Sequence, residues 1–326
     1  MKVSGAADLP VLPDNINYWQ EPVKEHNWQD SVVLTWWDAQ NEIGGFHRIG
    51  HEPNYEGGPK IALWSHITAP EGDYKNVVYL DLREEDRLAN GGFGAGETCK
   101  YEFIDGQHVW TINDAQVNAV IRHDDFHANV ECYPKDSNVS EDFANVHTDI
   151  PGKVTGELTV AGKQYNIAGL SFRDRGWGVR EWDYLLAHRW VAGTLGPDFS
   201  FLALSFYAAD ETLASFGWVV RGDTVTFAKA VDIVTYTEID GMVNRGGHVR
   251  FELTTGEVFD IECQRAADIA FTSYHHDICC VDVLCEARCG DLVGFCDFES
   301  TANIQAGKRQ PTRLVNSPVE NGFHPR

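Results

Sequence analysis

Near the middle of the chain the sequence reads Arg173-Asp174-Arg175-Gly176-Trp177-Gly178-Val179-Arg180-Glu181-Trp182-Asp183, between long runs that are typical of β-strands. These eleven residues include three arginines, three acids, two tryptophans and two glycines. Buried carboxylates and guanidiniums are costly unless they pair, so the interior of an ordinary strand is not expected here. A plain surface loop is not expected either, because tryptophan favours apolar cover. The composition therefore indicates a partly buried polar cluster between two β units, where a ligand pocket would also lie.

A purely structural role is the alternative for this cluster. Tryptophans can plug a gap beside a sheet, and ion pairs can fix the register of neighbouring strands. Residue types alone leave the functional and the structural interpretation open.

The order of residues within the cluster resembles a family signature. Asp-x-x-Trp-Gly after a strand, followed by Arg and Trp, is similar to the pattern of the carotenoid 1,2-hydratase-like (AttH-like) proteins. The matching positions are Asp174, Trp177, Gly178, Arg180 and Trp182. The resemblance implies a two-domain lipocalin-type protein from a superfamily that includes hydratases, dehydratases and pericyclase-type cyclases. The usual pattern has histidine directly after the aspartate, whereas this chain has Arg175, so a mechanism that needs an imidazole there is not expected.

A second resemblance to the same family lies in the N-terminal half. The sequence has Trp37-Asp38, then Gly44-Gly45-Phe46-x-Arg48-x-Gly50, and then Pro53-Asn54. The resemblance thus covers most of the chain loosely and is specific around residues 37–54 and 173–182.

Turn signals recur along the chain at the spacing of an antiparallel β protein. Strand-like runs such as 32–38 and 61–67 are followed by turns, and Asp105-Gly106 is a strong hairpin signal. Aromatic residues make up 12% of the chain, with ten Trp and seventeen Phe against two Met, which suits β-barrels better than helical bundles. We therefore predict an all-β fold with two antiparallel lipocalin-like barrel or sandwich domains packed together.

The domain bounds follow from the length and from one polar connection. A chain of 326 residues is expected to form one large or two medium domains. The stretch 133–148 is rich in Asn, Ser and Asp, and Pro151-Gly152 closes it, which is typical of a connection. We predict an N-terminal lipocalin-like domain over residues 1–155 and a C-terminal one over 156–326, with an extended tail from Ala306.

The charge balance and the cysteines restrict the partners and the compartment. A net charge of −23 argues against nucleic acid and anionic membranes, which need a basic footprint. The sequence has neither a signal-peptide pattern nor an apolar run long enough to span a membrane, so we expect a cytoplasmic protein without membrane insertion. Its eight cysteines include no CxxC pair and are expected to be reduced thiols that serve as small buried hydrophobes.

Two histidine clusters raise the question of a metal site. In His123-Asp124-Asp125-Phe126-His127, strand periodicity places both histidines and Asp125 on one face. Such a face can bind a metal ion or supply an acid/base pair, but strand imidazoles often find protein partners without a metal. His275-His276-Asp277 is a similar cluster. We predict no metal, and no cofactor either, because the sequence has no GxGxxG after a strand, P-loop, GxSxG or HExxH motif.

Acid-catalysed addition or removal of water is the chemistry that the central cluster favours. At a tertiary or allylic carbon this reaction passes through a cation, so it needs a proton donor and aromatic faces. Burial would raise the pKa of Asp174 and make it a competent acid, and Trp177 and Trp182 would supply the aromatic faces. Arg175 and Arg180 oppose this role, because a nearby cation lowers the pKa of a carboxyl. The other candidates for the acid are His47, His66, Asp125 and His188.

Two other functional classes stay open. In a pericyclase-like relative the protein folds and polarises the substrate, and Arg180 would activate a carbonyl. A lipocalin-like carrier would use only shape and an apolar lining, and it would need no acid.

The function that we predict is that of a cofactor-independent enzyme. It would hydrate or dehydrate a hydrophobic small molecule of terpenoid, steroid or polyketide type, with a cyclase, an isomerase or a non-catalytic carrier as the alternative. We expect a monomer or homodimer. The candidate catalytic residues are Asp174, Arg180, His47 and Asp125. The candidate substrate-binding residues are Trp177, Trp182, Arg175, His188, Trp64 and Tyr184.

Overall fold

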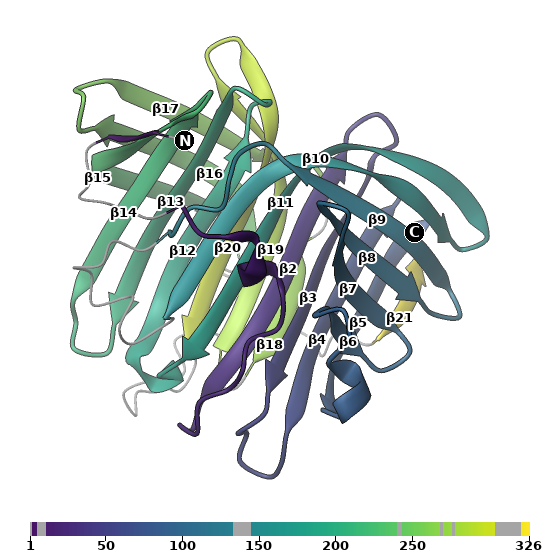
Figure 1. Ribbon diagram of the computed structural model, residues 1–326. Coiled ribbons are helices and arrows are strands. Elements are labelled where there is room, and N and C mark those ends of the chain that lie inside the picture. The colour runs from purple at the N-terminus through teal and green to yellow at the C-terminus, as the bar shows by residue number, and fades with distance from the viewer. Residues whose placement is uncertain are drawn as a thin grey trace. The chain divides into compact units, whose positions relative to one another are not determined.

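The protein is built almost entirely from antiparallel β-sheet (Figure 1). A computed structural model describes residues 2–4, 11–132, 145–239, 243–267, 270–275, 278–303 and 321–326. The chain divides into two compact units between Arg180 and Glu181. The sheet unit holds residues 11–132, 145–180 and 321–326, and the barrel unit holds residues 2–4 and the described residues of 181–303.

The sheet unit contains one sheet of eleven described strands. Their order is β21-β5-β4-β3-β2-β11-β10-β9-β8-β7-β6, and each neighbouring pair is antiparallel. The strands are β2 (Trp28–Asp38), β3 (Ile43–Glu52), β4 (Lys60–Ala69), β5 (Gly72–Asp81), β6 (Phe93–Ala95), β7 (Cys99–Ile104), β8 (Gln107–Asn113), β9 (Val117–Asp125), β10 (Val146–Val160), β11 (Lys163–Val179) and β21 (Gly322–Pro325). Two short 3-10 helices, η1 (Asp14–Asn17) and η2 (Glu84–Asp86), complete the unit.

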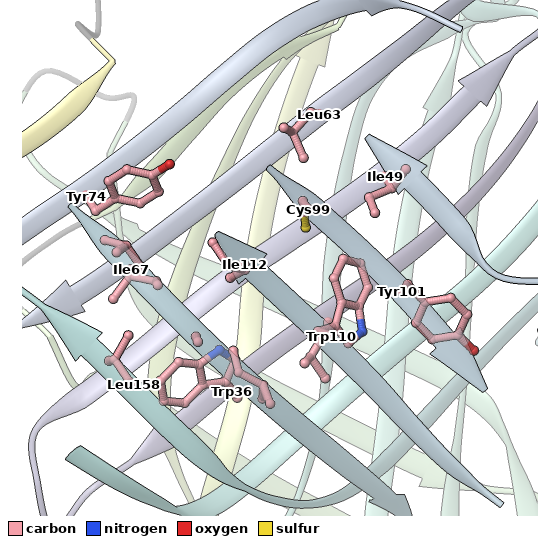
Figure 2. Close-up of a cluster of buried hydrophobic side chains, with 14 of the residues drawn as sticks. Trp36, Ile49, Leu63, Ile67, Tyr74, Cys99, Tyr101, Trp110, Ile112 and Leu158 are labelled. Carbon is pink, nitrogen blue, oxygen red and sulfur yellow. The ribbon is translucent and has the colours of Figure 1, made fainter. Parts of the chain in front are cut away.

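One face of this sheet carries the apolar core of the unit, and we call it the core face. Alternate side chains of each strand point to it because successive residues of a strand face opposite sides. Figure 2 shows ten of its side chains with labels, among them Trp36, Trp110 and Leu158. The other side of the sheet, which we call the opposite face, carries the remaining alternate residues.

The barrel unit closes on itself. The ring runs β15-β14-β13-β12-β20-β19-β17-β16 and returns to β15, while β18 pairs with β19 and β1 pairs in parallel with β15. The strands are β1 (Lys2–Ser4), β12 (Leu185–Thr194), β13 (Phe199–Ala208), β14 (Leu213–Arg221), β15 (Thr224–Thr237), β16 (Asn244–Leu253), β17 (Val258–Arg265), β18 (Phe271–His275), β19 (Ile278–Cys289) and β20 (Leu292–Asn303). A 3-10 turn, η3 (Trp182–Tyr184), precedes β12.

The core of the barrel unit is apolar and includes several cysteines. Phe201, Phe251 and Phe298 lie in it together with the free thiols of Cys263, Cys279, Cys285 and Cys296. The prediction that cysteine serves here as a small buried hydrophobe is confirmed for these four residues.

The predicted fold class is confirmed: the protein is all-β, with one closed barrel and one curled antiparallel sheet. The hairpin predicted at Asp105-Gly106 joins β7 to β8, and both turn residues have positive φ, 52° and 79°, as a type I′ turn requires. No helix among the described residues is both long enough and apolar enough to cross a membrane.

Two expectations from the sequence differ from the observed strands, and others fall on residues that the structure does not describe. The boundary placed at residues 155/156 falls within β10, which pairs with β11 over fifteen positions. Residues 173–179 form the end of β11 rather than a linker, and β11 is paired there with β10 and with β2. Most of the expected connection at 133–148, the tail from Ala306 to residue 320, and His276-Asp277 lie outside the described residues.

Candidate functional site

The charged residues at the end of β11 are shared between the two faces of the sheet. Arg173 and Arg175 lie opposite Leu34 and Val32 of β2, so they point to the core face. Asp174 points to the opposite face. The prediction against a strand interior was wrong because this alternation gives the charged side chains separate polar partners on the two sides of one strand.

Arg175 is a buried anchor within the sheet unit. Its guanidinium forms an ion pair with Asp30, and it donates hydrogen bonds to the backbone oxygens of Ile16 and Tyr18, each at 2.8 Å. The guanidinium also lies 4.8 Å from the centre of the Trp177 ring. Only 1% of Arg175 is exposed. This placement does not favour the substrate contact that we expected of Arg175 and of Trp177.

Asp125 is held as an anion by Arg173 on the core face. The guanidinium donates to both carboxylate oxygens at 2.6 Å, and Nε2 of His123 lies 2.8 Å from Oδ1. Burial raises the pKa of Asp125, but Arg173, together with His108 and His123, outweighs burial and holds this pKa well below its usual range. Asp125 is therefore a poor proton donor. Since Arg173 already binds both oxygens, the set of His123, Asp125 and His127 does not favour a metal either.

His47 is also unsuited to donate a proton. It lies on the core face, where Nε1 of Trp36 donates to its Nε2 at 3.1 Å and its Nδ1 contacts Oγ of Ser65. Burial lowers the pKa of His47 to about 3, so the imidazole is neutral at physiological pH.

On the opposite face, an imidazole lies between two carboxylates. Asp149 of β10 stands directly across from Asp174 of β11, and His147 follows on the same face two residues earlier. Nε2 of His147 is 3.3 Å from Oδ1 of Asp149 and 3.2 Å from Oδ1 of Asp174. The thiol of Cys132 donates to Oδ2 of Asp149 at 3.1 Å. We call these four residues the His147 cluster.

The charges of the His147 cluster depend on one another. Burial lowers the pKa of His147, but Asp174 and Asp149 outweigh burial and raise it to about 10. Burial raises the pKa of Asp149 to about 6, although His147 opposes the rise. Burial also raises the pKa of Asp174, but His147, Arg180 and Arg48 lower it below its ordinary value. At neutral pH the cluster thus holds a proton on His147, beside an ionised Asp174.

Asp174 therefore does not have the raised pKa that its proposed role as the acid required: burial raises this pKa as expected, but the neighbouring cations lower it by more. The sequence places no histidine at position 175, but the strand pairing supplies an imidazole from β10 instead. The side chain of Asp174 is 20% exposed, whereas that of Asp149 is fully buried, so Asp174 is the more accessible carboxylate of the cluster.

An arginine and two aromatic rings share the opposite face with the cluster. One row across the sheet runs from Trp64 on β4 to Arg48 on β3, Val33 on β2 and Asp174 on β11. The Arg48 guanidinium lies over the Trp64 ring, 4.7 Å from its centre, and Phe46 stacks on the same indole. Trp64, a predicted substrate-binding residue, is thus brought onto the face that carries Asp174.

The remaining candidates are divided between the two units. Arg180 follows β11 in the sheet unit, and its charge lowers the pKa of Asp174. Trp182 and Tyr184 form η3 and His188 lies in β12, all in the barrel unit. Nε2 of His188 contacts Oε1 of Glu299 at 2.6 Å. Within the sheet unit, the structure therefore groups Asp174, Arg180 and Trp64, and separates them from His47 and Asp125.

Three important residues of this face were not predicted as site residues: His147, Asp149 and Arg48. The period-two spacing of His147 and Asp149 was a readable signal, because it puts an imidazole and a carboxylate on one strand face. Arg48 belongs to the Gly44-Gly45-Phe46-x-Arg48-x-Gly50 motif, which by itself predicted no role for it.

The His147 cluster also has the donor types that a divalent cation accepts. Ligand atoms of His147, Asp149 and Asp174 all lie within 4.8 Å of one another. The same three groups can equally share a proton, and this alternative is tested by chelation below.

Comparisons with known proteins place the chain in a family and in a fold group. A family model described as "Domain of unknown function (DUF7064)" matches residues 13–304. Among curated proteins, none matches the sequence significantly.

Several solved structures have the same fold. NE1406 of Nitrosomonas europaea, described as an AttH, has a TM-score of 0.63 at 12% identity, over 90% of this chain and 99% of its own. Kievitone hydratase of Nectria haematococca has a TM-score of 0.62 at 12% identity, over 93% and 96%. CghA has a TM-score of 0.57 at 10% identity, over 94% and 98%. The resemblance to the carotenoid 1,2-hydratase-like superfamily is confirmed at the level of the fold.

Proposed function

We propose, for a chain that belongs to the family described as "Domain of unknown function (DUF7064)", that the His147 cluster is the acid–base centre of an enzyme acting on an apolar small molecule. The observation that carries the proposal is the imidazole of His147, placed between the carboxylates of Asp149 and Asp174 on a face that also bears Trp64 and Phe46. Protonation states shared among such close groups belong to the cluster as a whole.

Hydration or dehydration is the reaction that this arrangement supports best. In hydration, the cluster gives its proton to an alkene carbon, water adds to the resulting cation, and the proton lost by that water returns to the cluster. Dehydration runs the same steps in reverse. His147 holds the proton, and the partly exposed, ionised Asp174 is positioned to relay it between His147 and the substrate. A fold shared with kievitone hydratase is consistent with this reaction class.

Cyclisation is the second candidate. Arg48 and Arg180 are cationic donors near Asp174, and such donors can polarise a carbonyl while the protein holds a reactive conformation. Cyclisation leaves the mass of the substrate unchanged, whereas hydration or dehydration changes it by one water.

Mass spectrometry of a substrate panel separates these reactions. We would incubate the protein with terpenoid, steroid and polyketide alkenes and alcohols, with kievitone included, and measure gain or loss of one water. Asp174→Asn keeps the shape of the side chain and removes its charge, so we expect turnover to fall by about two to four orders of magnitude. Asp124→Asn on β9, a carboxylate paired with Lys153, is the matched control and should retain activity.

Two outcomes would count against the acid–base centre. Unchanged turnover in Asp174→Asn would remove the carboxylate from the chemistry. A lower melting temperature together with full residual activity of the folded fraction would leave Asp174 with a structural role only.

A further inference from the structure

Arg48 is a buried arginine without a carboxylate partner among the described residues. Only 5% of the residue is exposed, and its Nη1 is buried with no hydrogen-bond partner there. The nearby carboxylate of Asp174 lies across Val33, two strands away, and it already contacts His147. Two strand spacings correspond to about 10 Å between backbones. Burying a guanidinium without an acceptor costs free energy. A buried arginine of this kind is therefore expected to have a role outside the stability of the fold.

The sheet is shaped to hold the Arg48 guanidinium in place. The Trp64 ring lies beneath it at 4.7 Å, a cation–π contact. The guanidinium also lies against Gly50, two residues along β3, where an added Cβ would come within 2.6 Å of both terminal nitrogens of Arg48. The row that contains Gly50 continues through Ser31 to Gly176, so small residues flank the arginine across three strands.

Among the described residues, no charged side chain stands directly beside Arg48 in its row of the sheet. Within the sheet unit, its neighbours across the row are Trp64 on β4 and Val33 on β2, which carry no charge. Asp174 is the carboxylate whose pKa Arg48 affects, and His147 and Arg180 affect that carboxylate more strongly. A guanidinium presents a planar fork of donors that matches a carboxylate or another delocalised oxyanion.

We propose that Arg48 anchors an anionic oxygen of the substrate, so that the substrate is an apolar molecule bearing a carboxylate, enolate or phenolate. The oxygen would lie beside the guanidinium, about 10 Å along the sheet from the proton relay at Asp174. This assignment rests on the proposed function only in placing reaction and anchor on one face; binding of the oxyanion can be measured without turnover.

The first test compares cinnamate with its neutral counterpart cinnamamide in calorimetric titrations at neutral pH. A charged hydrogen-bonded pair contributes about 1.5–3 kcal/mol, so cinnamate should bind about 10- to 100-fold more tightly than the amide. In Arg48→Gln this preference should disappear, and Arg48→Lys should restore part of it. Arg122→Gln on β9 makes the same change of charge on another strand of the sheet and should leave the preference intact.

Two further variants keep the proposal open to refutation. Gly50→Ala retains the charge but displaces the guanidinium, so it should also reduce the preference for cinnamate. Ligand-free Arg48→Gln should melt only slightly below the parent protein, because the arginine loses its cation–π contact with Trp64 but no hydrogen-bond acceptor among the described residues. Equal affinity for both probes in the parent, a preference that survives Arg48→Gln, or a clear fall in melting temperature would overturn the anchor.

The binding test separates this inference from the proposed reaction. If Asp174→Asn and the parent protein both prefer cinnamate while no panel compound is turned over, the anchor stands and the acid–base function fails. If turnover depends on Asp174 but neither variant of Arg48 changes the preference, the function stands and the anchor fails.

Discussion

His147 reaches Asp174 from the neighbouring strand, and this contact determines which group in the cluster carries the proton. An isolated buried histidine is normally neutral, because burial disfavours its charged form. Here Asp174 and Asp149 reverse that tendency and raise the pKa of His147 to about 10. The consequence is a cation held on a sheet face at neutral pH, next to the more accessible carboxylate.

The protonation of His147 makes stability depend on pH. The folded-state pKa of about 10 lies above the ordinary value of 6.5, so the charged imidazole stabilises the fold fully below about pH 6.5. That stabilisation is lost as pH rises toward about 10. We expect the melting temperature of the parent protein to fall between pH 6.5 and pH 10, and that of His147→Gln to fall less. Parallel melting curves for the two proteins would contradict the raised pKa.

Strand β11 shows, at the scale of an element, what the sequence could and could not predict. Its residue types predicted a polar cluster, and the family motif pointed to Asp174 and Arg180. Its partners could not be predicted, because the register that aligns Asp174 with Asp149 is set by pairing between whole strands. For the same reason the sequence did not predict Arg48 as a site residue, because its placement depends on contacts with Trp64 on the paired strand and with Gly50.

Strand β21 protects an edge of the sheet unit. It pairs with β5 at four positions, and Phe323 packs against the apolar core. Nη2 of Arg326 also donates to Oγ1 of Thr68 at 2.8 Å. Removing residues 321–326 would expose the β5 edge and part of the core, and exposed edges promote association.

We expect this truncation to lower the free energy of unfolding of the sheet unit by about 1.5–3 kcal/mol, the value of burying one large apolar side chain. Urea titration would measure the loss, and light scattering would detect association. Phe323→Ala is the control that keeps the paired backbone. Its free energy of unfolding should fall by nearly as much as that of the truncated protein, but it should associate less than the truncated protein does. Unchanged unfolding of the truncated protein would show that β21 contributes little.

At the scale of the whole molecule, the turn spacing and the aromatic content predicted the all-β class, because hairpins depend on local sequence. The position of the division between units could not be obtained in this way. A polar stretch looked like a connection, but long strand pairing carries β10 and β11 through the expected boundary at 155/156.

Chelation tests whether the protein works with a proton or with a metal ion. We predict that activity survives exhaustive chelation and dialysis, because the imidazole and carboxylates of the His147 cluster can hold the proton that the reaction needs. Activity that disappears on chelation and returns with zinc would instead assign His147, Asp149 and Asp174 as ligands. Asp149→Asn should then reduce zinc affinity, which calorimetry can measure.

The exchange of terminal strands between the units has a consequence for synthesis on the ribosome. Domains generally fold as they emerge, N-terminal first. Here β5 is translated early, whereas its partner β21 follows only after every described strand of the barrel unit. Conversely, β1 is translated first and waits for β15. A nascent sheet unit therefore spends most of translation with β5 paired only to β4 and with its outer edge open, which makes this edge the natural target for a chaperone that binds extended chains.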